Sequence, residues 1–264
     1  MRVTTVSVEA DRGRTNEDHV AVGPSAAVVA DGAFLPGAEG VCHHGVAWYA
    51  RRLGGCLLEL VEAPGDQALP ALLAAAIERV TDEHRHTCDT ADPTSPWAAV
   101  AVVRVRPGVV ELLVLGDATV VVDRADGAAP IVLTDPREVR VGRSYLPALA
   151  AAGDEDVRGR VLAELRARRN RPGGFWVAKD DPRAADEAVT AQLPVADVRA
   201  VALLSNGASR VVDRFGLGDW EGVVADLAAT GPGEVVRRVR AAEQQQGVQQ
   251  DDASIAYCTC LTDG

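Results

Sequence analysis

The sequence of this 264-residue chain predicts an α+β fold or a layered sandwich. Strand-like apolar runs come in blocks, most clearly the three consecutive runs at 98–105, 109–115 and 119–124. Helical patterns come in groups before and after that block, and they do not alternate with strands as in a βαβ array. No repeat and no long Pro/Gly/Ser linker divides the chain, so we expect a single domain over residues 1–264.

The N-terminal part predicts three strands and then two helices. The strands are expected at 2–8, 20–22 and 26–30. A helix is expected over 45–61, because its apolar residues recur at helical spacing. These residues are Val46, Tyr49, Leu53, Leu57 and Leu60. A second amphipathic helix is expected over 68–88.

The remaining elements follow the central strand block. The first turn within that block, Arg106-Pro107-Gly108, is a typical hairpin signal. A flap-like helical insertion is expected at about 136–171, with a helix over 154–171 that ends at Pro172-Gly173-Gly174. The sequence then predicts strands at 175–178 and 198–204, helices at 219–229 and 232–246, and a last strand at 253–258.

Composition narrows the function classes. The net charge of −11 argues against a nucleic-acid partner, because phosphate backbones attract basic surfaces. No apolar stretch reaches the roughly 18 residues needed to span a bilayer, so we expect no membrane partner and a cytoplasmic protein. An arginine-rich run within the insertion is either a patch for an anionic partner or a solvated face. Its members are Arg158, Arg160, Arg166, Arg168, Arg169 and Arg171.

The cysteines do not predict a disulfide framework. There are five, an odd number, and no secretion signal precedes them. Cysteine and histidine lie close together at 42–44, 84–88 and 258–260, but none of these groups has the C-x2-C spacing of a structural zinc site. The spacing therefore argues against structural zinc.

Acidic or amide side chains follow several of the expected strands. Asp31-Gly32, Gly116-Asp117 and Ser205-Asn206-Gly207 each end an apolar run, and Asp251-Asp252 opens the last one. Carboxylates from separate strand ends suit hard cations such as Mg²⁺ or Mn²⁺. Taken singly, an Asp in such a place is as well explained as a turn former. Their order along the chain favours a metal site, in which Asn206 would be a ligand without charge.

With Arg14-Thr15-Asn16-Glu17-Asp18 before it, this series resembles the metal-dependent protein phosphatases of type 2C in their bacterial form. The resemblance runs from about residue 5 to 258. It implies a four-layer α-β-β-α sandwich of two antiparallel sheets flanked by helices, with two metal ions, and a third in bacterial members, at one edge. It further implies hydrolysis of phosphoserine or phosphothreonine in a protein substrate by a metal-bridging hydroxide.

The resemblance also implies a role for each motif residue. Glu17, Asp31 and the Gly32 carbonyl would bind one metal, and Asp31, Asn206 and Asp251 the second. Asp117 would bind the third, weaker metal, Asp18 would hold metal-bound water, and Arg14 would bind phosphate. The spacing from Arg14 to Asp18 is one residue shorter than the family pattern, which leaves Arg12 as an alternative.

Three departures from the family pattern bear on activity. The usual histidine after Asp31-Gly32 is absent from Ala33-Phe34-Leu35-Pro36-Gly37, where His43 or His44 could replace it as a proton donor, and the central strands open with Ser95-Pro96-Trp97-Ala98. Asn206 removes one negative charge from the second metal position, so weaker metal binding is expected there. The alternative to a weakened phosphatase is a pseudophosphatase that binds a phosphoprotein or partner without turnover.

Overall fold

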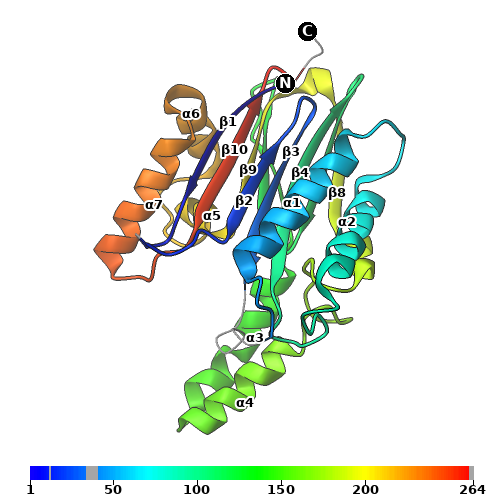
Figure 1. Cartoon of the computed structure of the whole chain (residues 1–264). Coiled ribbons are helices and arrows are strands. Elements are labelled where there is room, and N and C mark those ends of the chain that lie inside the picture. Colours follow the sequence, from blue (N-terminus) through cyan, green and yellow to red (C-terminus); the bar gives the residue numbers. More distant parts are fainter. Residues whose placement is uncertain (12, 34–40, 262–264) are drawn as a thin grey trace.

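The computed structural model describes residues 1–11, 13–33 and 41–261 and consists of two antiparallel five-stranded sheets packed face to face (Figure 1). The first sheet has the order β1 (Arg2–Val8), β10 (Ala253–Thr259), β9 (Val198–Leu204), β6 (Thr119–Arg124) and β7 (Ile131–Thr134). The second has the order β2 (Asp18–Val22), β3 (Ala26–Ala33), β4 (Trp97–Arg106), β5 (Val109–Leu115) and β8 (Val189–Pro194).

Helices cover the outer face of each sheet. Helices α1 (Val46–Glu62) and α2 (Leu69–His84) pack on the second sheet. Helices α5 (Asn206–Asp213), α6 (Trp220–Thr230) and α7 (Pro232–Gln246) pack on the first. The insertion forms α3 (Arg137–Ala151) and α4 (Glu155–Arg166), which project together from one end of the sandwich (Figure 1). The expected four-layer α-β-β-α sandwich is confirmed.

The central strands are apolar at nearly every position because both of their faces are covered. In β3, Val28 and Ala30 face the α1–α2 layer, whereas Ala27 and Val29 face the other sheet. Because successive side chains of a strand point to opposite faces, a strand covered on both sides needs apolar residues at every position. In β4, nine of the ten residues are buried for the same reason.

Several elements differ from the sequence prediction. Residues 175–178 do not form a strand, and Phe175 and Ala178 instead make isolated bridges to Arg169 and Ala98. Helix α2 ends at His84 rather than at residue 88. Helix α3 lies within the expected helical insertion, and the helix expected over 154–171 ends at Arg166. Strands β7 and β8 and helix α5 had no clear sequence signal. Within the part of the chain that the structure describes, no helix is long and apolar enough to cross a membrane.

Candidate metal centre

Two acidic residues of the second sheet, Asp18 and Asp31, lie at one end of the space between the sheets. Asp18 in β2 and Asp31 in β3 are directly paired across the two strands. Asp31 continues the alternation of Ala27 and Val29, whose side chains face the first sheet. Its Oδ2 accepts a hydrogen bond from the backbone nitrogen of Asn206, at 2.7 Å, where α5 begins. Strand alternation therefore delivers Asp31 to the junction of the two sheets.

A glycine is required next to Asp31 because the chain passes close to its neighbours. A Cβ atom at Gly32 would lie 2.4 Å from the backbone oxygen of Glu17 and 2.7 Å from a methyl group of Val46. Both contacts are shorter than van der Waals distance, and one of them is to backbone, which has little freedom to move. Gly32 thus allows the Asp31 and Glu17 segments to approach each other.

Asp252 organises the loop that carries Glu17. One of its carboxylate oxygens accepts a hydrogen bond from the backbone nitrogen of Ala10 at 2.7 Å, and the other from that of Glu17 at 2.6 Å. Asp252 is buried, so these two charge-assisted bonds fix the N-terminal loop against the start of β10. The sequence pointed to Asp251 as the metal ligand. In the structure Asp251 lines the cleft, whereas Asp252 holds the backbone of the N-terminal loop.

A cleft of about 250 Å³ opens over this region. Arg14, Glu17, Gly32 and Asp251 all line it, so four of the predicted site residues share one cavity. Arg14 is exposed and close enough to Glu17 to lower the pKa of that carboxyl. A guanidinium at the mouth of an acidic cleft can bind the oxygens of a phosphate group.

Burial and mutual repulsion raise the pKa of the clustered carboxyls. Burial is the main cause throughout, and it raises the pKa of Glu17 to about 7 and those of Asp18 and Asp117 to about 6. The charge of Asp252 adds to the rise at Glu17, and the pKa of Asp31 also lies well above its usual value. One Asp18 oxygen is buried without a hydrogen-bond partner. Crowded carboxylates with an unpartnered oxygen are the donor set that a divalent cation stabilises, and the residues on the Glu17–Asp31 side fit one.

The Asn206 side of the cluster is arranged differently. The amide nitrogen of Asn206 donates a hydrogen bond to Asp117 at 2.8 Å. Arg210 donates to Asp251 at 2.5 Å and also pairs with the buried Glu243 at 3.0 Å. Two carboxylates expected to bind metal are thus paired with protein donors, so a cation has to displace these contacts and fits this side less well.

Three residues of the site were missed by sequence reasoning, namely Asp252, Arg210 and Glu138. Arg210 lies four residues after Asn206 on α5, and this spacing, which places two residues on one helix face, could have indicated it. Glu138 on α3 is half-buried, and burial, followed by the charge of Asp117, raises its pKa to about 8. The sequence carries no signal for Glu138, because it approaches the cluster only through the placement of the insertion.

The sequence left His43 or His44 as an alternative proton donor and Arg12 as an alternative phosphate ligand. Residues 34–37, which replace the usual loop histidine, and Arg12 lie outside the described residues. His43 and His44 both lie against the thiol of Cys88, at 3.5 and 3.3 Å. Neither histidine has a contact with the carboxylate cluster among the hydrogen bonds of the described residues.

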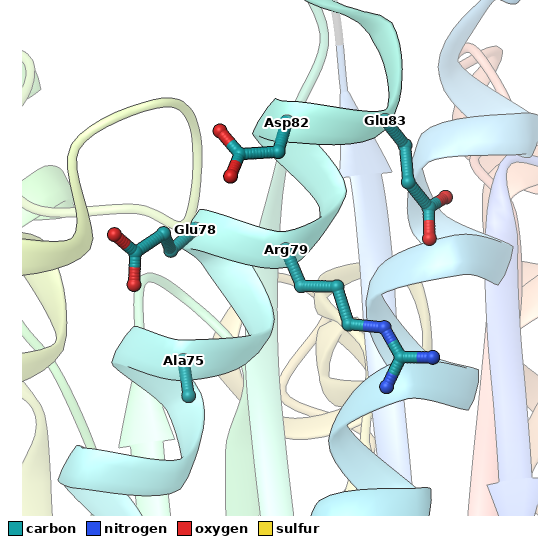
Figure 2. A pocket seen from close by; sticks show the side chains of 5 residues that line it. All are labelled: Ala75, Glu78, Arg79, Asp82 and Glu83. Atoms are coloured by element: carbon teal, nitrogen blue, oxygen red, sulfur yellow. The ribbon is translucent and has the colours of Figure 1, made fainter.

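A second hollow lies on the outer face of α2 (Figure 2). It is lined by Ala75, Glu78, Arg79, Asp82 and Glu83. Arg79 and Glu83 point toward α1 in Figure 2, where they pair with Glu59 and Arg52 respectively. Arg79 and Glu83 are thus used in ion pairs at the surface, and we assign this hollow no role in the chemistry.

Comparison with known proteins agrees with the geometry. The family described as protein phosphatase 2C matches residues 9–230, and no curated protein matches the sequence. Among solved structures, the Ser-Thr phosphatase MsPP from Mycobacterium smegmatis is 17% identical, with a TM-score of 0.57 over 98% of both chains. The phosphatase Stp1 from Staphylococcus aureus is 12% identical, with a TM-score of 0.62 over 99% of this chain and 95% of that one.

A third structure is the catalytic domain of the serine threonine phosphatase PstP in complex with two manganese ions. It is 16% identical, with a TM-score of 0.60 over 98% of this chain and 97% of that one. At these identities the structural matches establish the fold alone, whereas the family match covers most of the chain. The chain therefore belongs to the protein phosphatase 2C family.

Proposed function

We propose that this protein is a phosphomonoesterase that depends on Mg²⁺ or Mn²⁺ and acts on phosphoserine or phosphothreonine in a protein substrate. The observation that carries the proposal is the cleft in which Arg14 faces the carboxylates of Glu17 and Asp251, beside Gly32. It combines one cation that can bind phosphate with two carboxylates, and burial, followed by the charge of Asp252, raises the pKa of Glu17 to about 7.

Glu17, Asp31 and the carbonyl of Gly32 would hold the first cation, and Asp31, Asn206 and Asp251 the second. When bound, such cations activate a water molecule and neutralise charge that develops on a phosphoryl group. A further ion would be bound at Asp117.

The side chains contribute the rest of the chemistry. Arg14 would bind and orient the phosphate, because its fork of N–H donors matches two phosphate oxygens. Asp18, buried and with one unpartnered oxygen, would accept a proton or hydrogen bond from water in the cleft. Asp252 would keep Glu17 in place through the backbone nitrogen of that residue.

Asn206 would limit this activity. It brings no charge to the second position, and its amide nitrogen already bonds to Asp117. The pairing of Arg210 with Asp251 acts in the same direction, since a cation would have to displace it. These two contacts favour a second candidate, a pseudophosphatase that binds a phosphorylated protein without turnover.

Hydrolysis of p-nitrophenyl phosphate and of a phosphothreonine peptide, with Mn²⁺ and with EDTA, tests the proposal. We expect activity that requires Mn²⁺ and is lost in Asp31→Asn. The control Asp66→Asn removes the same charge from a side chain that is 94% exposed, so it should behave as wild type. A rate in EDTA equal to that in Mn²⁺ would refute the phosphatase proposal, and phosphopeptide binding without hydrolysis would establish the second candidate.

A further inference from the structure

A group of soft metal ligands lies apart from the carboxylate cluster, at the junction of α1 and α2. Cys42 and His44 precede α1, and Cys88 follows α2. One potential ligand atom from each of the three lies within 4.8 Å of the other two. Both cysteines are buried, and all three residues belong to the part of the chain that the structure describes. We propose that Cys42, His44 and Cys88 form a site for a tetrahedral, thiophilic cation such as Zn²⁺.

The distances match a tetrahedron around zinc. With Zn–S of about 2.3 Å and Zn–N of about 2.0–2.1 Å, ligand atoms of a tetrahedral site are about 3.3–3.8 Å apart. The His44 Nδ1 atom lies 3.3 Å from the Cys88 sulfur and 3.9 Å from the Cys42 sulfur. These two distances differ from the tetrahedral range by at most about a tenth of an ångström, and the two sulfur atoms lie within 4.8 Å of each other.

His43 could supply a fourth ligand. His43 Nδ1 lies 3.5 Å from the Cys88 sulfur, which is another distance of the same tetrahedron. His43 is exposed, so its ring has room to turn toward an ion. A Cys2His2 set completed by His43 would be a closed coordination sphere, which is typical of structural zinc rather than catalytic zinc.

Neighbouring groups already orient the central histidine. The ring of His44 stacks on Trp48 of α1, with ring centres 4.3 Å apart. His84, the last residue of α2, approaches His44 edge-on at 5.8 Å. The Nδ1 atom of His84 contacts the backbone oxygen of Val80 at 2.6 Å, which fixes its own ring. Packing that holds a ligand in place before the ion arrives is the usual support of a protein metal site.

The proposed zinc site lies beside the helix that packs against the Gly32 segment of the carboxylate cluster. The backbone nitrogen of Asp89 already donates to the backbone oxygen of Val41 at 3.3 Å, so the two segments run together. A bound ion would join the start of α1 to the chain after α2. Helix α1 also packs directly against Gly32 through Val46 and Ala50. The ion would thus hold the helix that covers one of the proposed metal-binding segments.

The sequence argued against structural zinc because no group of Cys and His has C-x2-C spacing. That argument fails here because the ligands come from two segments that the α1–α2 pair brings together. If Cys88 only contacts the two imidazoles through its thiol, no metal binding is expected.

Titration of the reduced, Mn²⁺-loaded protein with Co²⁺ tests the proposal. Thiolate ligands give Co²⁺ an intense charge-transfer absorption that carboxylates do not, so the two sites are distinguished without measuring activity. We expect one equivalent of Co²⁺ with this absorption, and its displacement by Zn²⁺. Cys42→Ser and Cys88→Ser should each weaken binding at least about tenfold, and the matched control Cys56→Ser, a buried cysteine within α1, should not.

Circular dichroism of each variant verifies that it is folded, and His44→Gln provides a third test at a half-buried position. Absence of the thiolate absorption in wild type, or its persistence in Cys88→Ser, would overturn the proposal. The absorption should also persist in Asp31→Asn, so loss of the phosphatase proposal would leave this one standing.

Discussion

Replacing Asn206 by aspartate should lower the stability of the metal-free protein. The change removes the hydrogen bond from the amide nitrogen to Asp117 and places two carboxylates next to each other. A hydrogen bond to a charged group contributes about 1.5–3 kcal/mol. For a domain of this size, 1 kcal/mol corresponds to roughly 2–4 °C in Tm, so we expect a decrease of about 3–12 °C in EDTA.

The same change should strengthen metal binding. At about 4 Å and an effective dielectric constant near 20, two unit charges interact by about 4 kcal/mol, and a divalent ion roughly doubles this value. Desolvation of the added carboxylate offsets a large part. A net gain of about 2–4 kcal/mol corresponds to a decrease of about 30- to 1,000-fold in the Kd for Mn²⁺ at the second position.

Calorimetric titration with Mn²⁺ and thermal melts with EDTA or Mn²⁺ measure both effects. The control Gln245→Glu adds the same charge at an exposed position on α7 and should change neither quantity. Phosphatase activity should rise together with Mn²⁺ affinity. If Asn206→Asp leaves both the metal-free Tm and the Mn²⁺ affinity at their wild-type values, the arrangement described for this side of the cluster is wrong.

Three further predictions concern the fold around the site. The pKa values of Glu17 and Asp18 are raised to about 7 and about 6 in the folded state, so their contribution to stability is full below about pH 4 and is lost as pH rises to about 7. Thermal melts in EDTA should show that stability falls as pH rises over this range, whereas the fall should disappear in saturating Mn²⁺. The same pH dependence with and without Mn²⁺ would contradict the prediction. Gly207→Ala should destabilise the protein by several kcal/mol, because the new Cβ would lie 1.9 Å from the backbone oxygen of Asp252. Urea denaturation should show this loss, whereas Gly55→Ala, which has open space in α1, should be neutral or stabilising, and equal effects would refute the argument. Asp252→Asn replaces the carboxylate by a neutral amide with one acceptor oxygen, so one of the two bonds to backbone nitrogens is lost and the other is no longer charge-assisted. The variant should cost about 1.5–3 kcal/mol and lower Mn²⁺ affinity, and a wild-type value of both would count against its role.

The sequence pattern predicted an α+β fold or layered sandwich and most of its elements, and the resemblance to type 2C phosphatases implied the two antiparallel sheets. The strongly apolar strands β4, β5, β6 and β9 lie where their patterns placed them, because a strand buried on both faces has no polar position to obscure it. The predictions were weakest for an edge strand and for a short segment outside the sheets. Strand β8 is half exposed and contains polar residues, and the apolar segment 175–178 packs as irregular chain rather than as a strand.

The sequence suggested which residues lie near one another but not the contacts that they make. Arg14, Glu17, Gly32 and Asp251 share a cleft, as their order along the chain suggested. The pairing of Asn206 with Asp117, and of Arg210 with Asp251, depends on the distance between sheets and on the start of α5, which no local pattern encodes. The same holds for the cysteine–histidine cluster, whose members are adjacent only after α1 and α2 pack together.

The central claim is that the Glu17–Asp31 side of the cluster binds a divalent cation more tightly than the Asn206–Asp251 side. Anomalous diffraction from crystals equilibrated with increasing Mn²⁺ measures this most directly, because it reports occupancy at each position separately. We expect a manganese peak beside Glu17, Asp31 and the Gly32 carbonyl at low concentration, and one beside Asn206 and Asp251 only at much higher concentration. Equal occupancy of both positions at every concentration, or a first peak beside Asn206, would contradict the claim.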